Sequence, residues 1–207
     1  MLPSGPDLSF ETAAQARGAF RIVGIDEVGR GPWAGPVTAC AIRLTGPAPE
    51  GLNDSKKLTA KRREALVPLL ERCCDIGFGE ATVEEIDRLN IRQATHLAMR
   101  RAVAALPFAP DHLLIDGNDC PDWVDCPRDV IKGGDGRSLS IAAASVLAKT
   151  RRDQGMMALA QQFPGYGWDR NAGYGTKAHQ DGLRLHGVTQ HHRRSFAPIH
   201  KILCQTP

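Results

Sequence analysis

The sequence predicts an α/β fold, in which helices flank a mixed five-stranded sheet and a small helical appendage follows at the C-terminus. Short apolar segments rich in β-branched residues indicate strands, and longer segments with apolar residues at helical spacing indicate helices. Strands near the start are followed by alternating helices and strands, which is typical of a sheet with an antiparallel hairpin side and a parallel crossover side. Helices and loops dominate the last third of the 207 residues, which predicts the appendage.

The strands are expected where apolar runs meet turn residues. The first two runs are joined by a turn rich in glycine and proline, which favours pairing of the two segments. A later short run ends in an acid. The five expected strands are residues 20–26, 37–44, 76–81, 112–116 and 130–131, and the last of these carries the weakest signal.

The helices are expected between and after these strands. Thr59 suits an N-cap for a helix over residues 60–74, although Pro68 lies inside that segment and is expected to kink it. The string from Thr82 to Glu85 has the form of a capping box. Further helices are expected at residues 10–16, 91–106, 140–162 and 176–186.

The chain length predicts a single domain over residues 20–207, preceded by a poorly ordered lead-in at residues 1–19. No apolar run approaches the roughly 20 residues of a membrane helix, and the lead-in lacks the apolar core of a signal peptide. We therefore expect a cytoplasmic protein whose six cysteines are reduced thiols.

The charge pattern leaves the kind of partner open. The net charge is only +3 at pH 7, which does not by itself indicate nucleic-acid binding. Most basic clusters are solvated surface, whereas several on one face would form a stripe that contacts phosphates. The clusters are residues 56–57, 61–63, 100–101, 149–152 and 191–194.

The most informative string is IVGIDEVGRGPWAGPV, residues 22–37. Two carboxylates, Asp26 and Glu27, follow a strand-like run, and the turn Gly29-Arg30-Gly31 comes directly after them. Neighbouring residues of a strand point to opposite faces, so one acid must lie unusually unless the strand ends there. Acids of this kind can hold a hard cation, and the turn can bind a phosphate.

Three more acids are candidates for the same site. Asp116 ends the fourth expected strand and Asp135 precedes the long helix, although a turn acid and a helix cap are the ordinary interpretations of the two. Asp153 ranks lower, because Lys149 lies four residues before it and suits an ion pair. Carboxylates from separate strands, without a histidine or cysteine motif, suit Mg²⁺ or Mn²⁺.

Six strings carry a resemblance to a known family. They are IDEVGRG, NDSKKL, LLIDGN, IAAASVLAKTRRD, GYGT and HHRRSF, and in this order and spacing they resemble ribonuclease HII, the type 2 ribonuclease H, from about residue 23 to residue 202. The resemblance implies a ribonuclease H-like fold and a metal-dependent endonuclease that acts as a monomer. Its partners would be RNA/DNA hybrids and duplex DNA with single ribonucleotides, which it would incise on the 5′ side of the ribonucleotide. The products would carry 5′-phosphate and 3′-hydroxyl ends.

The resemblance also implies roles for particular residues. The catalytic and metal-binding acids would be Asp26, Glu27, Asp116 and Asp135, which would hold Mn²⁺ or Mg²⁺, with two ions during catalysis. The backbone of Gly29, Arg30 and Gly31 would sense the 2′-hydroxyl, and Tyr174 would stack on the following deoxyribose. Further contacts to the substrate would come from Ser55, Lys56, Ser145 and Lys149, and Arg193 and Arg194 are further candidates.

Two departures from the family pattern bear on these roles. An extra residue in Lys132-Gly-Gly-Asp135 makes Asp129 a rival for the fourth acid. Asn171 and Ala172 stand where the family often has a basic residue, so Arg170 is a candidate substitute.

Two other interpretations are less favoured. The sister type, ribonuclease HIII, typically carries an additional N-terminal domain, whereas only 22 residues precede Val23 here. A non-catalytic module that binds duplexes would have no use for four acids, which repel phosphates without a metal.

Overall fold

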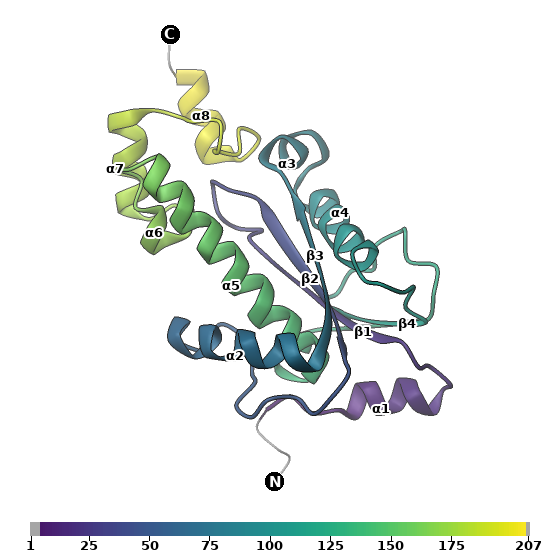
Figure 1. Cartoon of the computed structure of the whole chain (residues 1–207). Coiled ribbons are helices and arrows are strands. Elements are labelled where there is room, and N and C mark those ends of the chain that lie inside the picture. Colours follow the sequence, from purple (N-terminus) through teal and green to yellow (C-terminus); the bar gives the residue numbers. More distant parts are fainter. Residues whose placement is uncertain (1–4, 206–207) are drawn as a thin grey trace.

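A five-stranded mixed sheet forms the centre of the computed structural model, which describes residues 5–205 (Figure 1). The strand order is β3-β2-β1-β4-β5, with antiparallel pairing from β3 through β1 and parallel pairing from β1 through β5. This confirms the predicted sheet with a hairpin side and a crossover side. The strands are β1 (Ile22–Val28), β2 (Val37–Leu44), β3 (Cys74–Ala81), β4 (His112–Asp116) and β5 (Arg128–Ile131).

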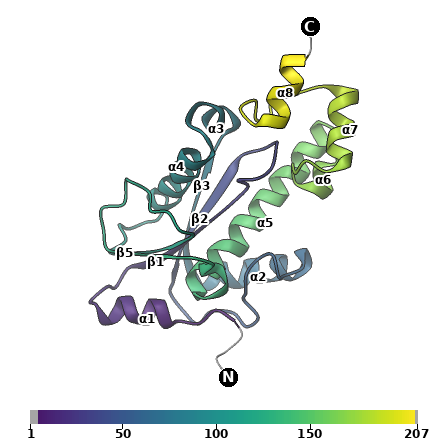
Figure 2. The same cartoon turned by 180° about the vertical axis from the view of Figure 1, so that it is seen from behind.

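Helices cover both faces of this sheet (Figure 2). Thr59 caps the first large helix through a bond from the Arg62 N–H, and Thr82 and Glu85 form the predicted capping box. Pro68 lies inside its helix, which continues to Cys73. The helices up to the long central one are α1 (Ser9–Ala16), α2 (Ala60–Cys73), α3 (Val83–Leu89), α4 (Ile91–Ala104), the short 3-10 helix η1 (Gly134–Gly136) and α5 (Leu139–Gln162).

Alternating residues of β2 explain the two layers. Ala39 and Ala41 pack in the core on the α4 side, whereas Cys40 and Ile42 pack on the side of α2 and α5. The helix on the first side comes very close to the sheet: a Cβ added at Gly79 would lie 2.2 Å from the Ala98 carbonyl oxygen. Only glycine in β3 allows this approach.

The helix expected at residues 10–16 is present as α1, within the segment that the sequence predicts to be a poorly ordered lead-in. Residues 9–16 form α1, and the Glu11 carboxylate accepts hydrogen bonds from the Ser138 hydroxyl (2.7 Å), the Ser140 N–H (2.9 Å) and the Ser140 hydroxyl (2.6 Å). The free N–H groups at the start of α5 need acceptors, and a carboxylate there also complements the helix dipole. This contact holds α1 against the start of α5. Residues 1–4 lie outside the described residues.

A small helical layer follows the long helix, as the sequence predicted. It packs on the C-terminal half of α5 (Figure 1). The contact is made by an apolar cluster that contains Met156, Tyr166 and Trp168. Its helices are α6 (Trp168–Asn171), α7 (Lys177–His186) and α8 (Ala197–Gln205). Among the described residues, no helix has the length and apolar character required to cross a membrane.

Candidate active site

Two carboxylates lie side by side where β1 and β4 run in parallel. Ile25 pairs with Ile115, and the next residue on each strand is an acid, Asp26 or Asp116. Parallel neighbours bring these positions to the same edge of the sheet, although one acid lies within its strand and the other ends its strand. The structure therefore brings together two of the acids that the sequence selected.

The strand does not end at Asp26 as predicted, because β1 continues through Glu27 to Val28. Asp26 pairs across the hairpin with Cys40, on the α5 side, and Glu27 pairs with Ala39, on the α4 side. The two carboxylates therefore leave the strand on opposite faces.

The fourth acid is brought in by η1. The Gly134 N–H donates a 2.6 Å hydrogen bond to Asp116 Oδ1, which fixes η1 against the end of β4. Asp135 follows directly and is 6% exposed. Its rival Asp129 lies on β5, where its carboxylate is already bonded to Arg17 and to His112.

Three of the acids have raised pKa values, and burial is the main cause in each. Burial, then the charges of Glu27 and Asp116, raises the pKa of Asp26 well above its usual range. Burial also raises the pKa of Glu27, against the opposing effect of Arg30, and burial together with Asp116 raises the pKa of Asp135. The site thus concentrates negative charge that the protein does not fully neutralise.

An excess of carboxylate charge with oxygen donors fits a hard divalent cation. The side chains are not yet gathered, however: within residues 5–205, no three groups among His, Cys, Asp and Glu are spaced to hold a metal ion. The opposite orientations of Asp26 and Glu27 keep those two carboxylates on different faces of the sheet.

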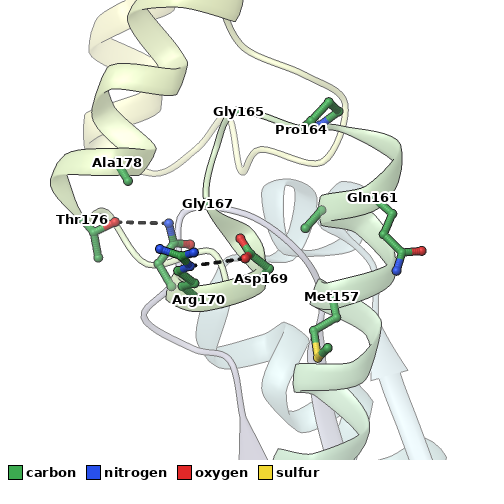
Figure 3. A pocket seen from close by; sticks show the side chains of 11 residues that line it. Met157, Gln161, Pro164, Gly165, Gly167, Asp169, Arg170, Thr176 and Ala178 are labelled. Carbon is green, nitrogen blue, oxygen red and sulfur yellow. Dashed lines mark hydrogen bonds and ion pairs between the residues drawn. The ribbon is translucent and has the colours of Figure 1, made fainter.

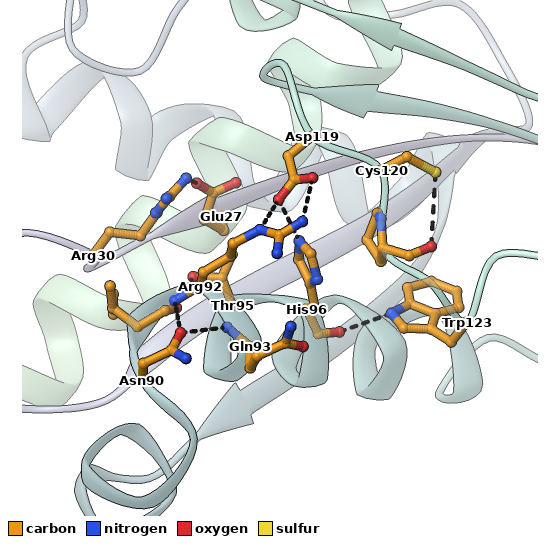
Figure 4. A network of polar contacts seen from close by, with 12 residues as sticks. Glu27, Arg30, Asn90, Arg92, Gln93, Thr95, His96, Asp119, Cys120 and Trp123 are labelled. Carbon is orange, nitrogen blue, oxygen red and sulfur yellow. Dashed lines mark hydrogen bonds and ion pairs between the residues drawn. The ribbon is translucent and has the colours of Figure 1, made fainter.

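On the α4 side, Glu27 borders a polar network that the sequence did not reveal (Figure 4). Arg92 binds the Asp119 carboxylate through two nitrogens, at 2.5 and 2.8 Å, and the His96 ring lies 3.0 Å from the same carboxylate. The Arg92 guanidinium lowers the pKa of Asp119 to about 2. Because the pair joins α4 to the loop after β4, only the tertiary fold reveals it.

The turn after β1 lies beside Tyr174. A Cβ at Gly31 would lie 3.3 Å from Tyr174 Cε1, and the Trp33 N–H donates to the Gly173 carbonyl oxygen at 2.8 Å. Tyr174 is 47% exposed, so it is not a packed core aromatic. Arg30 pairs with Glu27 at 3.4 Å and links this turn to the acids.

The expected basic and hydroxyl contacts have partners within the protein. Ser145 is buried, and its hydroxyl lies 2.8 Å from that of Ser55. Lys149 donates to the Asp153 carboxylate at 2.7 Å. Ser145 and Lys149, which were both expected to contact the substrate, therefore have different partners. Lys56, which is exposed, lies 3.5 Å from the Asp135 carboxylate.

Asn171 supports the turn that carries Tyr174. Its side chain accepts from the Gly173 N–H at 2.9 Å and donates to the Tyr166 carbonyl and to Thr176. The expected substitute, Arg170, points into solvent beside Asp169. It borders a pocket of about 760 Å³ between α5 and α7 (Figure 3), and none of the four acids lines that pocket.

One of the residues selected from the sequence does not lie on the surface. Arg193 was a candidate for a duplex contact, but its side chain is fully buried and bonds backbone carbonyls. Its neighbour Arg194 is exposed. Sequence reasoning treats arginine as a surface residue, which is the common case.

Known proteins resemble this chain over most of its length. The sequence model of the family described as "Ribonuclease HII" matches residues 23–199. The ribonuclease HII of Ruegeria sp. (strain TM1040) is 63% identical over 201 residues, which cover 97% of this chain and 88% of that protein. The ribonuclease HII of Paracoccus denitrificans (strain Pd 1222) is 61% identical and covers 97% of this chain and 96% of its own length.

Solved structures share the fold at lower identity. The ribonuclease H2 from Pyrococcus horikoshii OT3 has a TM-score of 0.73 at 23% identity, over 87% of this chain and 96% of that one. Bst-RNase HIII in complex with Mn²⁺ has a TM-score of 0.68 at 19% identity, over 88% of this chain and 69% of that one.

Proposed function

The chain belongs to the ribonuclease HII family and is a ribonuclease H endonuclease, and from this premise we propose that it incises duplex DNA on the 5′ side of single embedded ribonucleotides and cleaves the RNA strand of RNA/DNA hybrids. The observation that carries this proposal is the position of the turn at residues 29–31 between the acids and Tyr174. A strand that reaches the acids would pass over that turn.

The four acids are proposed to hold divalent ions, Mg²⁺ or Mn²⁺. Their oxygen donors and the raised pKa values of Asp26, Glu27 and Asp135 support this assignment, because a bound cation would favour the charged carboxylates. Two bound ions would stabilise the attacking and leaving oxygens of an in-line phosphodiester hydrolysis. The Gly134 N–H would keep Asp116 oriented throughout.

The turn and the tyrosine are proposed to select the cleavage site. The 2′-hydroxyl distinguishes RNA from DNA, and the glycines let backbone approach the sugar that carries it. The exposed ring of Tyr174 would then cover the next sugar, so that a deoxyribose there is preferred. The exposed cations Arg30 and Lys56 would contact phosphates.

The decisive experiment is cleavage of an end-labelled DNA duplex with one embedded ribonucleotide, with and without Mg²⁺ or Mn²⁺. We expect metal-dependent incision on the 5′ side of the ribonucleotide, with 5′-phosphate and 3′-hydroxyl ends. Metal-independent cleavage, or cleavage of an all-DNA duplex at the same rate, would overturn the proposal.

Asp116→Asn gives the first prediction. The substitution should nearly abolish cleavage and leave hybrid binding largely intact, because it removes one ligand charge and leaves the surrounding surface unchanged. Turnover and the equilibrium dissociation constant of the hybrid are measured on the same preparations. Asp125→Asn, at an exposed acid outside the site, is the matched control. Normal turnover by Asp116→Asn would contradict the assignment of the site.

A further inference from the structure

Two arginine side chains are buried in this protein without a carboxylate partner. Arg152 of α5 is 2% exposed and Arg193, which precedes α8, is 0% exposed. In the part of the chain that the structure describes, neither guanidinium takes part in an ion pair. Burial lowers the pKa of Arg193 to about 9, so it remains charged at neutral pH. Burying a charge without a counter-ion is costly, so its partners need explanation.

The partners are backbone carbonyls of the loop that joins β1 to β2. Arg193 donates to the carbonyl oxygens of Gly29 (2.5 Å) and Arg30 (3.0 Å) and, further along, to those of Gly35 and Pro36. Arg152 donates to the carbonyl oxygens of Ala34 (3.1 Å) and Pro36 (3.0 Å) in the same loop. Two cations thus bind one loop of eight residues, 29–36.

The Arg193 bonds have a directional consequence. A trans peptide is planar, so a carbonyl and the N–H of the following residue point in opposite directions. Holding the carbonyls of Gly29 and Arg30 toward the interior therefore turns the N–H groups of Arg30 and Gly31 outward. Neither N–H donates a hydrogen bond within residues 5–205, so both are available to a substrate oxygen.

The hydrogen bonds of Arg152 connect this loop to the turn that carries Tyr174. Its third donor binds the Ala172 carbonyl oxygen at 2.9 Å, two residues before Tyr174. Ala172 has a positive φ of 46°, a conformation that costs free energy in a non-glycine residue and persists only when its surroundings enforce it. Gly29, with φ 98°, permits the approach, since a Cβ there would lie 2.3 Å from Arg152 Nε.

We propose that Arg193 is a positioning residue that aims the Arg30 and Gly31 N–H groups at the substrate, and that Arg152 fixes this turn relative to Tyr174. The inference rests on the proposed function, because it assigns these N–H groups to recognition of the ribonucleotide. A guanidinium suits the task because its planar fork spans several carbonyls, which the single ammonium of lysine cannot do.

The test compares variants of Arg193 on two substrates, a duplex with one ribonucleotide and the same duplex made only of DNA. Arg193→Gln and Arg193→Lys are compared with Arg184→Gln, a control at a 73% exposed arginine of α7. Dissociation constants for a duplex with one ribonucleotide and for the all-DNA duplex are measured with each change placed in the Asp116→Asn protein, which should not cleave. In the active protein, kcat and KM are measured on the ribonucleotide duplex.

We expect Arg193→Gln to bring the ratio of the two dissociation constants toward one and to lower kcat by about 100-fold, the usual effect of a small misplacement. KM should change much less than kcat. Arg193→Lys should have a kcat between those of Arg193→Gln and the unaltered protein, and Arg184→Gln should match the unaltered protein. Hydrogen exchange should accelerate at residues 29–36 and leave the central sheet unchanged.

Each other outcome is decisive. A variant with unchanged kcat and unchanged discrimination overturns the positioning role, and so does failure of both Arg193 variants to fold, which would show a structural role alone. If the unaltered protein itself does not distinguish the ribonucleotide duplex from DNA, the proposed function fails as well, which separates the two failures.

Discussion

At the scale of single residues, the acids differ in their hydrogen-bond and ion-pair partners. Asp116 receives a backbone N–H from Gly134, whereas Asp135 lies 3.5 Å from the exposed Lys56 and close to the carboxylates of Asp54 and Asp116. Asp129 already pairs with Arg17, and the His112 ring lies within hydrogen-bond distance of its carboxylate. A carboxylate that is already paired within the protein is a poor candidate for a metal ligand, so these differences favour Asp135 over Asp129 as the fourth acid.

The competition between Asp135 and Asp129 gives the second prediction. Asp135→Asn should lower kcat by on the order of 10²–10³-fold, a typical loss for one electrostatic group in an active site, and should raise the Mg²⁺ concentration needed for activity. Asp129→Asn should cleave at close to the unaltered rate. A Mg²⁺ titration of both variants measures this. The reverse ranking would make Asp129 the fourth ligand.

Tyr174 gives the third prediction. Tyr174→Ala should impair incision at single ribonucleotides about two- to tenfold more than cleavage of long hybrids, because only the junction substrate offers a deoxyribose under the ring. Tyr174→Phe keeps the ring and should retain the preference. The ratio of kcat/KM on the two substrates reports it, and equal losses on both would argue against the junction role.

Residues of the candidate site could be predicted from the sequence where a short local motif contains them. Asp26 and Asp116 were found because each is an acid that closes an apolar run. The burial of Arg193 and the pairing of Arg92 with Asp119 could not be found in this way, because both depend on contacts between segments far apart in the chain.

At the scale of elements, strong local patterns set the fold. The capping box before α3 and the apolar run of β4 were predicted at their observed positions. In contrast, α6 was not predicted, because it has four residues between two left-handed positions, Gly167 and Ala172, and shows no helical periodicity. The strand β3 begins at Cys74, two residues earlier than expected, because α2 passes directly into it.

The contact between α1 and α5 gives the fourth prediction. Glu11→Ala should lower the free energy of unfolding by about 1–2 kcal/mol, the usual cost of losing a helix cap. Glu11→Gln keeps an acceptor and should lose less. Chemical denaturation measures both, with Glu71→Gln on the exposed face of α2 as the control. Unchanged stability would mean that the N-terminal segment is the poorly ordered lead-in that the sequence first predicted.

At the scale of the whole molecule, a chain of hydrogen bonds connects the C-terminal layer to the turn that carries Tyr174. Trp168 Nε1 can only donate, so His179 Nε2 is an acceptor (3.2 Å) and His179 Nδ1–H donates to the Tyr174 carbonyl oxygen (3.0 Å). His192 Nδ1 accepts from the Thr189 N–H, so its Nε2–H donates to His179 Nε2 (3.0 Å). With these directions both rings are neutral, each carrying one N–H that donates within the chain of bonds.

This chain gives the fifth prediction, a dependence of stability on pH. Burial, and then His179, lowers the pKa of His192 to about 4, below the value near 6.5 expected in the unfolded chain. Between these values the unfolded state binds the extra proton, so the contribution of His192 is complete above about pH 6.5 and is lost as the pH falls to about 4. The loss should be about 3 kcal/mol.

A variant isolates this effect from other groups, because the raised pKa values of Asp26, Glu27 and Asp135 act with the opposite sign as the pH falls. The difference in unfolding free energy between the unaltered protein and His192→Gln should therefore shrink from pH 7 to pH 4.5, whereas His200→Gln, at an exposed ring, should show a constant difference. Denaturant titrations at several pH values measure these differences. If the His192→Gln difference does not change with pH, the ring is not held neutral, and the donor directions that lead to Tyr174 do not hold.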